Sequence, residues 1–525
     1  MEVGLRLVGL LQLIIRWLMK PFYFLSSLKV TRLLPTLKSP YLTKSATELA
    51  AKIRTGEVSS EDVVRAFISR IKEVNPLLNA VVEDRFSAAL EDAREVDKLV
   101  ASKRKTEQEL EEETPFLGVP FTVKESCKLQ GMSYCVGHLP RANIKADKDG
   151  EAVHQLRKAG AIPLAVTTTP ECCLSWETNN LVTGKTLNAF DRTRTSGGSS
   201  GGEGALLGSG ASVIGVGSDI AGSIRLPAMY NGVFGHKPTP GYVPVIGHYP
   251  YSQDPEFCRY LVLGPMARYA MDLKPMLKIM AGNKAELLKL DEKVDLHKIK
   301  AFYMEDFGFS LAALQVDIEV KDRLRQAAKY LQEQFSIPVQ KGNFEYLEES
   351  VDISCSVFFG MQGLPDMMRE IFSSKVESNL IGEICKSLMG TSQYSMSALL
   401  FFILVSMNGM VPRSKYPQYY KQMTSLLKSF EETLGDNGVF LYPTHPTPAL
   451  YHNESYMATA GVLYTTIFNL LGMPSTQVPL GLNSHGMPIG IQVVAAPHHD
   501  RLCLAVAEEL EKGFGGWFPP PMTSS

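Results

Sequence analysis

The order of apolar and polar segments along this chain predicts strands that alternate with helices. Apolar residues at positions 63, 64, 67, 68 and 71 recur every three or four residues and predict a helix over Ser59–Lys72. Short apolar runs at Gly118–Val123 and Ile162–Val166 have the length of buried strands. Between them, Glu151–Ala159 has a helical pattern that stops at Gly160. This succession is typical of an α/β fold.

The same alternation continues to the C-terminus. Strands are expected at Val213–Val216 and Pro488–Val494, and a helix is expected at Asp500–Lys512. Such apolar strands fit a sheet that helices cover on both faces. The sequence contains no internal repeat and no long linker, so we expect residues 39–525 to form one domain. Residues 300–440 are rich in Met and Phe and are predicted to be a helical insertion or cap.

The first 38 residues differ from the rest and are predicted to attach the chain to a membrane. A straight helix over residues 5–28 would be about 36 Å long, enough to cross a bilayer. Arg6, Arg16 and Lys20 interrupt this segment, and Pro21 would kink it. The three cations fall within an arc of about 80°, which favours a helix that lies in the membrane interface. A single transmembrane helix is the alternative.

A second apolar region runs from Ser387 to Pro412 without a charged residue. Its centre, Met396–Met407, is too short to span a bilayer comfortably. We expect either a buried helix or an exposed cap that contacts lipid or lines a channel for an apolar chain.

Composition excludes several classes of protein. The 525 residues include 53 Lys and Arg and 55 Asp and Glu, so the net charge of −2 provides no basic field for nucleic acid. The charged fraction of 21% and the hydrophobic fraction of 45% are those of a globular protein. The eight cysteines include no Cys-x-x-Cys pair, so we expect buried reduced thiols rather than a metal site or a disulfide framework.

The densest chemical signal is the Gly/Ser-rich stretch Thr195–Ile224, whose glycines let backbone approach a reacting atom closely. The nearby Gly-Lys-Thr at 184–186 does not complete a P-loop, because Asn179 stands where the first glycine is needed. Residues 197–201 match the Gly-x-Ser-x-Gly elbow of α/β-hydrolases, which would make Ser199 a nucleophile. An elbow follows a buried strand, however, and residues 189–196 are polar.

The stretch from Gly197 to Arg225 closely resembles the motif that defines the amidase signature family of amide hydrolases. Carried over residue by residue, the resemblance makes Lys124 the base, Ser199 the bridging serine and Ser223 the nucleophile. Segments 234–241, 438–449 and 479–497 resemble the branch of this family that hydrolyses fatty-acid amides. The likeness covers roughly residues 44–518.

The resemblance implies the amidase-signature fold, a large twisted mixed β-sheet covered by helices on both faces, with neither metal nor cofactor. It implies a cis peptide between Gly198 and Ser199, and an oxyanion hole formed by Ile220, Ala221 and Gly222. The family commonly has glycine where this chain has Ala221, and a Cβ restricts φ there. The Ala221 N–H stays in place, so the expected role is kept while the geometry of the loop is left open.

These residue types suit amide hydrolysis. A serine hydroxyl attacks once a base removes its proton, and a lysine acts as that base when burial keeps it neutral. Ser199 would relay the proton between Lys124 and Ser223, and Ser200 is the alternative relay. Nearby acidic and basic side chains, Asp219 and Arg225, are expected to form an ion pair that fixes the loop.

The resemblance and the two apolar regions together predict a membrane-attached serine amidase. It would hydrolyse long-chain fatty-acid amides, such as N-acyl ethanolamides and primary amides, through an acyl-enzyme on Ser223. Its partners would be a small lipid amide and an intracellular membrane or lipid droplet, whereas the oligomeric state stays open. Val357–Met368 and Met396–Met407 are the candidate linings of the acyl site. The alternatives are a glutamine-hydrolysing amidotransferase-type amidase and an esterase that uses Ser199.

Overall fold

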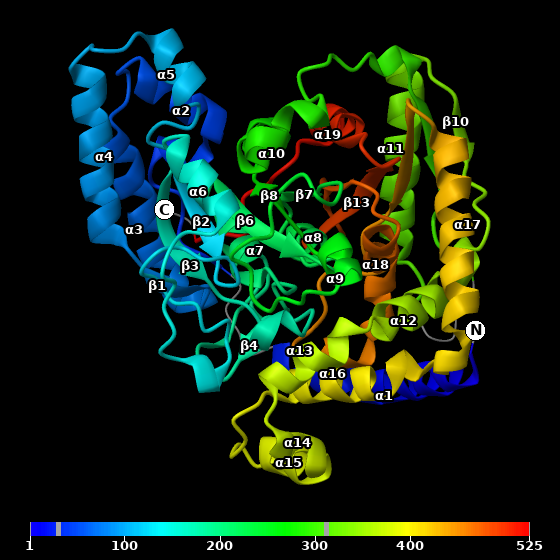
Figure 1. The fold of residues 1–525 in the computed structure, drawn as a ribbon. Coiled ribbons are helices and arrows are strands. Elements are labelled where there is room, and N and C mark those ends of the chain that lie inside the picture. The colour runs from blue at the N-terminus through cyan, green and yellow to red at the C-terminus, as the bar shows by residue number, and fades with distance from the viewer. Residues whose placement is uncertain (1, 28–32, 309–313, 524–525) are drawn as a thin grey trace.

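The computed structural model describes residues 2–27, 33–308 and 314–523. Within these residues, one sheet of 11 strands runs through the molecule (Figure 1). In spatial order its strands are β1 (Val81–Asp84), β3 (Ile162–Thr167), β2 (Pro120–Lys124), β6 (Ile214–Asp219), β8 (Val262–Ala267), β7 (Phe234–Lys237), β12 (Ser475–Leu482), β13 (Pro488–Ala495), β11 (Gly438–Pro443), β9 (Lys300–Tyr303) and β10 (Val339–Lys341). The sheet is mixed, because β2 runs parallel to β3 and β6 whereas β6 and β8 are antiparallel.

Helices cover both faces of this sheet, which confirms the α/β prediction. Every residue of β2, β3, β6, β8, β11 and β13 is buried. Successive side chains of a strand point to opposite faces, so both faces must be covered. The helices outside segment 300–440 that follow the N-terminal one are α2 (Ala46–Arg54), α3 (Ser60–Leu78), α4 (Phe86–Ala101), α5 (Glu107–Glu113), α6 (Glu151–Lys158), α7 (Gly201–Gly208), α8 (Arg225–Tyr230), α9 (Pro255–Tyr260), α10 (Leu273–Ala281), α18 (Leu463–Leu470) and α19 (Asp500–Phe514).

Helix α3 shows how the local sequence sets the element. The Ser59 side chain caps its start and accepts a hydrogen bond from the backbone N–H of Asp62 at 3.3 Å. The helix continues beyond the predicted end at Lys72, because Val74 and Leu78 extend its buried apolar face.

Segment 300–440 corrects one expectation. It is largely helical, with α11 (Ile318–Phe335), α12 (Ser350–Gly360), α13 (Gly363–Ile371), α14 (Ser374–Ser378), α15 (Leu380–Leu388), α16 (Met396–Ser406) and α17 (Tyr416–Leu434). It also supplies β9 and β10, which extend the main sheet in parallel beside β11. The segment is therefore part of the sheet and not only a helical insertion. These two strands are short and partly exposed, so they lack the continuous apolar run of a buried strand.

The N-terminal residues form one long helix, α1 (Val3–Ser27), that continues through Pro21. It lies toward the lower end of the molecule in Figure 1, beside α16, below α12 and above α14 and α15. The expected shared face of Arg6, Arg16 and Lys20 is not seen. Arg6 and Lys20 are exposed, whereas Arg16 turns inward and pairs with the buried carboxylate of Glu454, Nε to Oε1 at 2.7 Å.

In the part of the chain that the structure describes, none of the helices combines the length and the apolarity needed to cross a membrane. Residues 1 and 28–32 of the predicted attachment segment lie outside the described residues.

Candidate active site

Two adjacent parallel strands place the catalytic candidates together. Lys124 is the last residue of β2, and Ser218 lies near the end of its neighbour β6. In sheets of this kind the site forms beyond the carboxyl ends of the parallel strands. The fully buried Lys124 Nζ lies 2.7 Å from Ser199 Oγ and 2.8 Å from Ser218 Oγ. The structure thus joins the predicted base to the predicted bridging serine and adds a second hydroxyl that the sequence did not single out.

Ser223 lines the same small pocket as Ser199 and Ser218. Among the described residues, its hydroxyl has no hydrogen-bond partner, and none joins it directly to Ser199. The Ser200 N–H donates to the Ser223 carbonyl at 3.2 Å, which ties the two Gly/Ser loops together. The Ser200 hydroxyl bonds to the Ser218 carbonyl at 3.4 Å and not to Lys124, which disfavours it as the alternative relay.

The surroundings of Ser199 do not fit a nucleophile elbow. No regular strand leads into it in the described chain, and its hydroxyl contacts the Lys124 amine rather than a histidine. The Gly198–Ser199 peptide is cis, as the resemblance implied.

The loop before Ser223 corrects the predicted oxyanion hole. The Gly222 N–H donates to Asp219 Oδ1 at 2.7 Å, so it is not available to an oxyanion. The N–H groups of Ile220, Ala221 and Ser223 have no acceptor among the described residues, which leaves these three as the donors that can serve a developing negative charge. The Asp219 side chain turns back onto its own loop, a local contact that spacing alone did not predict.

Glycine is needed at position 222 rather than at 221. Gly222 has a φ of 103°, and a Cβ there would lie 2.1 Å from the Thr465 hydroxyl oxygen. Ala221 has no positive φ, so its Cβ does not strain the loop. The departure from the family pattern is therefore accommodated.

A buried ion pair fixes this loop, as predicted. Arg225 Nη2 donates to Asp219 Oδ1 at 3.0 Å, and both side chains are fully buried. Burial alone would raise the pKa of Asp219, but the charge and hydrogen bonds of Arg225 outweigh it and hold this pKa well below its ordinary value. Within the described residues, no group of three or more His, Cys, Asp or Glu could hold a metal ion.

His248 completes the polar network and was missed by sequence reasoning. Its Nδ1 lies 2.9 Å from the Pro250 carbonyl, which can only accept, so Nδ1 carries the proton. Its Nε2, 2.9 Å from Ser218 Oγ, must then accept from the Ser218 hydroxyl. Burial and, second, the positive charge that Lys124 carries when it is protonated lower the pKa of His248 to about 3. Hydrogen bonds therefore run in one direction from Lys124 through Ser218 to His248.

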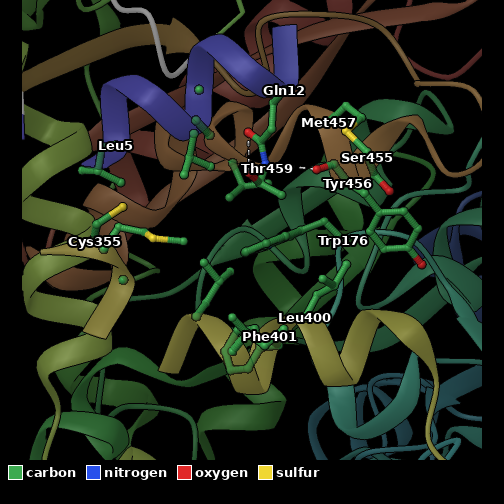
Figure 2. Close-up of a pocket in the computed structure, with 18 of the residues that line it drawn as sticks. Leu5, Gln12, Trp176, Cys355, Leu400, Phe401, Ser455, Tyr456, Met457 and Thr459 are labelled. Carbon is green, nitrogen blue, oxygen red and sulfur yellow. Dashed lines mark hydrogen bonds between the residues drawn. The ribbon is translucent and has the colours of Figure 1, made fainter. Parts of the chain in front are cut away.

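An apolar cavity of about 370 Å³ adjoins the catalytic pocket, within the range of small-molecule sites. The two share Leu174, Ser175, Trp176 and Phe401 as lining residues, and the Trp176 indole N–H donates to the Ala221 carbonyl at 3.3 Å. Figure 2 shows α1 on one side of this cavity and α16, with Leu400 and Phe401, on the other.

Both predicted linings lie at these pockets. Helix α16 borders the cavity, and so does Phe359 from the segment Val357–Met368. Phe358, Leu364 and Met367 from that segment line the catalytic pocket instead.

Comparison with known proteins decides the family. The sequence model of the Amidase family matches residues 62–504. The chain belongs to this family. This amidase is 43% identical over 499 residues to fatty-acid amide hydrolase 2-B of Danio rerio, covering 93% of this chain and 92% of that protein. It is 41% identical over 485 residues to human fatty-acid amide hydrolase 2, covering 92% and 91% of the two chains.

A solved structure of fatty acid amide hydrolase superimposes on this amidase with a TM-score of 0.72 at 23% identity. The match covers 91% of this chain and 87% of that chain, and it establishes a shared fold. The amidase is an amide hydrolase with the mixed-sheet fold that the sequence predicted.

Proposed function

We propose that this amidase hydrolyses long-chain fatty-acid amides to a free fatty acid and an amine, through an acyl-enzyme on Ser223. The apolar cavity that adjoins the Ser223 pocket carries this proposal. Burial of an acyl chain contributes about 0.8 kcal/mol per methylene, so a cavity of this kind favours long chains strongly. Two relatives that align with more than nine-tenths of this chain are named as fatty-acid amide hydrolases, which supports the same substrate class.

Lys124 is the proposed base. Its amine contacts two hydroxyls and one carbonyl oxygen, and no carboxylate lies within ion-pair distance among the described residues. To act as the base, this amine must offer a lone pair to the Ser199 proton, and the 2.7 Å between Lys124 Nζ and Ser199 Oγ puts that proton within reach.

These positions support the following reaction. Lys124 takes the Ser199 proton while Ser199 takes the Ser223 proton, and Ser223 Oγ attacks the amide carbonyl. The oxyanion accepts hydrogen bonds from the N–H groups of Ile220, Ala221 and Ser223. The relay then protonates the leaving amine as the C–N bond breaks. Water, deprotonated by the same relay, cleaves the acyl ester and restores Ser223.

We further propose that the amidase attaches to an intracellular membrane or lipid droplet through α1 lying in the interface. The outward face of α1 carries exposed apolar side chains, among them Leu7 at 64% and Trp17 at 71% exposure. Ile381 and Leu388 of α15 are also exposed, at 78% and 75%, and α15 and α1 both lie toward the lower end of the molecule in Figure 1. An extended apolar surface of this kind is typical of contact with lipid.

Activity-based labelling tests the nucleophile. A fluorophosphonate probe should label the wild-type protein, and Ser223→Ala should abolish the label. Retained labelling in Ser223→Ala together with its loss in Ser199→Ala would instead make Ser199 the nucleophile. Substrate class is tested by kcat/KM on amides of two to twenty carbons, which should rise with chain length.

A further inference from the structure

Polar contacts fix the beginning of α1 onto the folded chain. The Glu2 carboxylate accepts hydrogen bonds from Lys415 Nζ at 2.7 Å and from the Tyr419 hydroxyl at 2.5 Å. The Glu2 backbone N–H donates to Asp352 Oδ1 at 2.6 Å. These contacts come from α12, from α17 and from the residue that precedes α17, so the first turn is held by segments more than 300 residues away.

The middle of α1 is fixed in the same way. The Gln12 side-chain amide donates to the Tyr456 carbonyl and to the Thr459 hydroxyl, both at 3.2 Å. Arg16 pairs with Glu454 four residues further on. A helix that only crossed lipid would have no use for such partners, whereas a helix that is part of a binding site needs a fixed position.

Between these fixed points, one face of α1 borders the apolar cavity. Leu5, Val8, Gln12 and Ile15 recur every three or four residues and line it. Figure 2 shows Leu5 and Gln12 on the α1 side of the cavity, facing Leu400 and Phe401 of α16.

We propose that α1 is a wall of the acyl-binding site, with the substrate chain held between its inward apolar residues and α16. The proposal rests on the proposed function, since it assigns the apolar cavity to the acyl chain. It gives the N-terminal helix a second role, because its inward face selects the chain while its outward face meets lipid. Substitutions on the inward face of α1 should therefore change the preferred acyl-chain length without changing the rate of amide hydrolysis for short chains.

Two neighbouring substitutions in the full-length protein separate these faces. Val8→Trp places an indole in the cavity, whereas Leu7→Trp places it on the outward face. Excluding about two methylenes from the cavity corresponds to roughly a tenfold loss. For detergent-dispersed amides we expect Val8→Trp to lower kcat/KM at least about tenfold for sixteen carbons and less than about twofold for four carbons. Leu7→Trp should change neither value.

Leu404 lines the opposite wall of the cavity on α16, and Leu404→Trp should shorten the preferred chain in the same way. This variant keeps the test decisive if Val8→Trp unfolds, which a thermal melt would reveal. Equal effects of Val8→Trp and Leu7→Trp, or an unchanged chain-length profile in both wall variants, would overturn the proposal.

A wild-type protein that hydrolysed no amide would contradict the proposed function alone. Binding of a fluorescent sixteen-carbon acyl amide, weakened by Val8→Trp and not by Leu7→Trp, would still report on the wall.

Discussion

The direction of individual hydrogen bonds shapes the catalytic centre. A lysine amine that acts as a base has two N–H donors and one lone pair. Because the Ser218 hydroxyl donates its proton to His248, Ser218 can only accept from this amine. With one N–H directed at Ser218, the lone pair is free to accept the Ser199 proton. With Lys124 as the proposed base, we infer that His248 acts on it through Ser218, as a positioning residue with no hydrogen bond to Ser199 among the described residues.

This role predicts unequal effects of two substitutions. His248→Leu leaves the buried Ser218 hydroxyl without its acceptor, at a cost of about 1–3 kcal/mol, so kcat on a four-carbon amide should fall about tenfold with a smaller change in KM. His248→Gln supplies an amide oxygen in place of Nε2 and should recover most of kcat. Equal losses in the two variants would mean that His248 contributes only packing.

The same histidine makes stability depend on pH. Its pKa is about 3 in the folded protein, below the ordinary value of 6.5. The unfolded chain therefore binds a proton below about pH 6.5 that the folded chain does not, and stability falls as pH falls through this window. Between pH 7 and 5, wild type should lose up to about 2 kcal/mol more unfolding free energy than His248→Gln. Equal losses in denaturant melts would contradict this.

The sequence pointed to Lys124, Ser199 and Ser223 as catalytic candidates because the stretch around the two serines resembles the defining motif of the amidase signature family. It did not reach His248, because 30 residues separate it from Ser218 and no spacing rule links a loop histidine to a strand-end serine. It also assigned the Gly222 N–H to an oxyanion, whereas Asp219 takes it. Contacts that depend on how a loop folds back are not encoded in a pattern of residue types.

At the scale of elements, periodicity predicted the strands and helices whose apolar faces are continuous. The last two strands of the sheet, β9 and the edge strand β10, were missed because they are short and partly exposed. For α1, periodicity indicated an amphipathic helix but not its orientation. The partner of Arg16 is Glu454, 438 residues away, and only the tertiary fold brings this carboxylate to the helix.

The Arg16–Glu454 pair predicts how α1 is held. Arg16→Met leaves the buried Glu454 carboxylate without its cation, a costly state, so α1 should undock more often. Amide hydrogen exchange in residues 10–27 should accelerate about tenfold. Arg6→Met changes an exposed cation on the same helix and serves as the matched control, with no change expected. Unchanged exchange in Arg16→Met would mean that apolar contacts alone dock the helix.

At the scale of the whole molecule, the mixed sheet holds the catalytic loops at its centre while α1, α15 and α16 gather toward one end (Figure 1). The fold class followed from local apolar runs, but the strand order joins segments distant in sequence, such as β7 with β12. No local pattern contains that pairing. It is this order that brings the C-terminal half of the chain next to the Lys124 and Ser223 loops.

This arrangement predicts that substitutions can weaken membrane binding without lowering catalytic activity. Trp17→Glu with Leu388→Glu charges the exposed apolar surface on α1 and α15, and should weaken binding to anionic phospholipid vesicles at least about tenfold in flotation assays. Hydrolysis of a soluble four-carbon amide should stay unchanged, because neither residue lines the cavity or the catalytic pocket. Leu287→Glu, at another exposed site that follows α10, is the control and should bind as wild type.

Salt distinguishes the forces in this attachment. The exposed Arg6 and Lys20 flank the apolar surface, and a basic residue near an anionic membrane contributes about 1 kcal/mol that salt screens. Wild-type binding should therefore weaken but persist at high ionic strength, while the doubly substituted protein should be released completely. Persistent binding of that variant would place the contact elsewhere. A tag placed before Glu2 tests the alternative on sealed vesicles with the catalytic domain outside. Protection of this tag from protease would show that the N-terminal helix crosses the membrane and would contradict interfacial attachment.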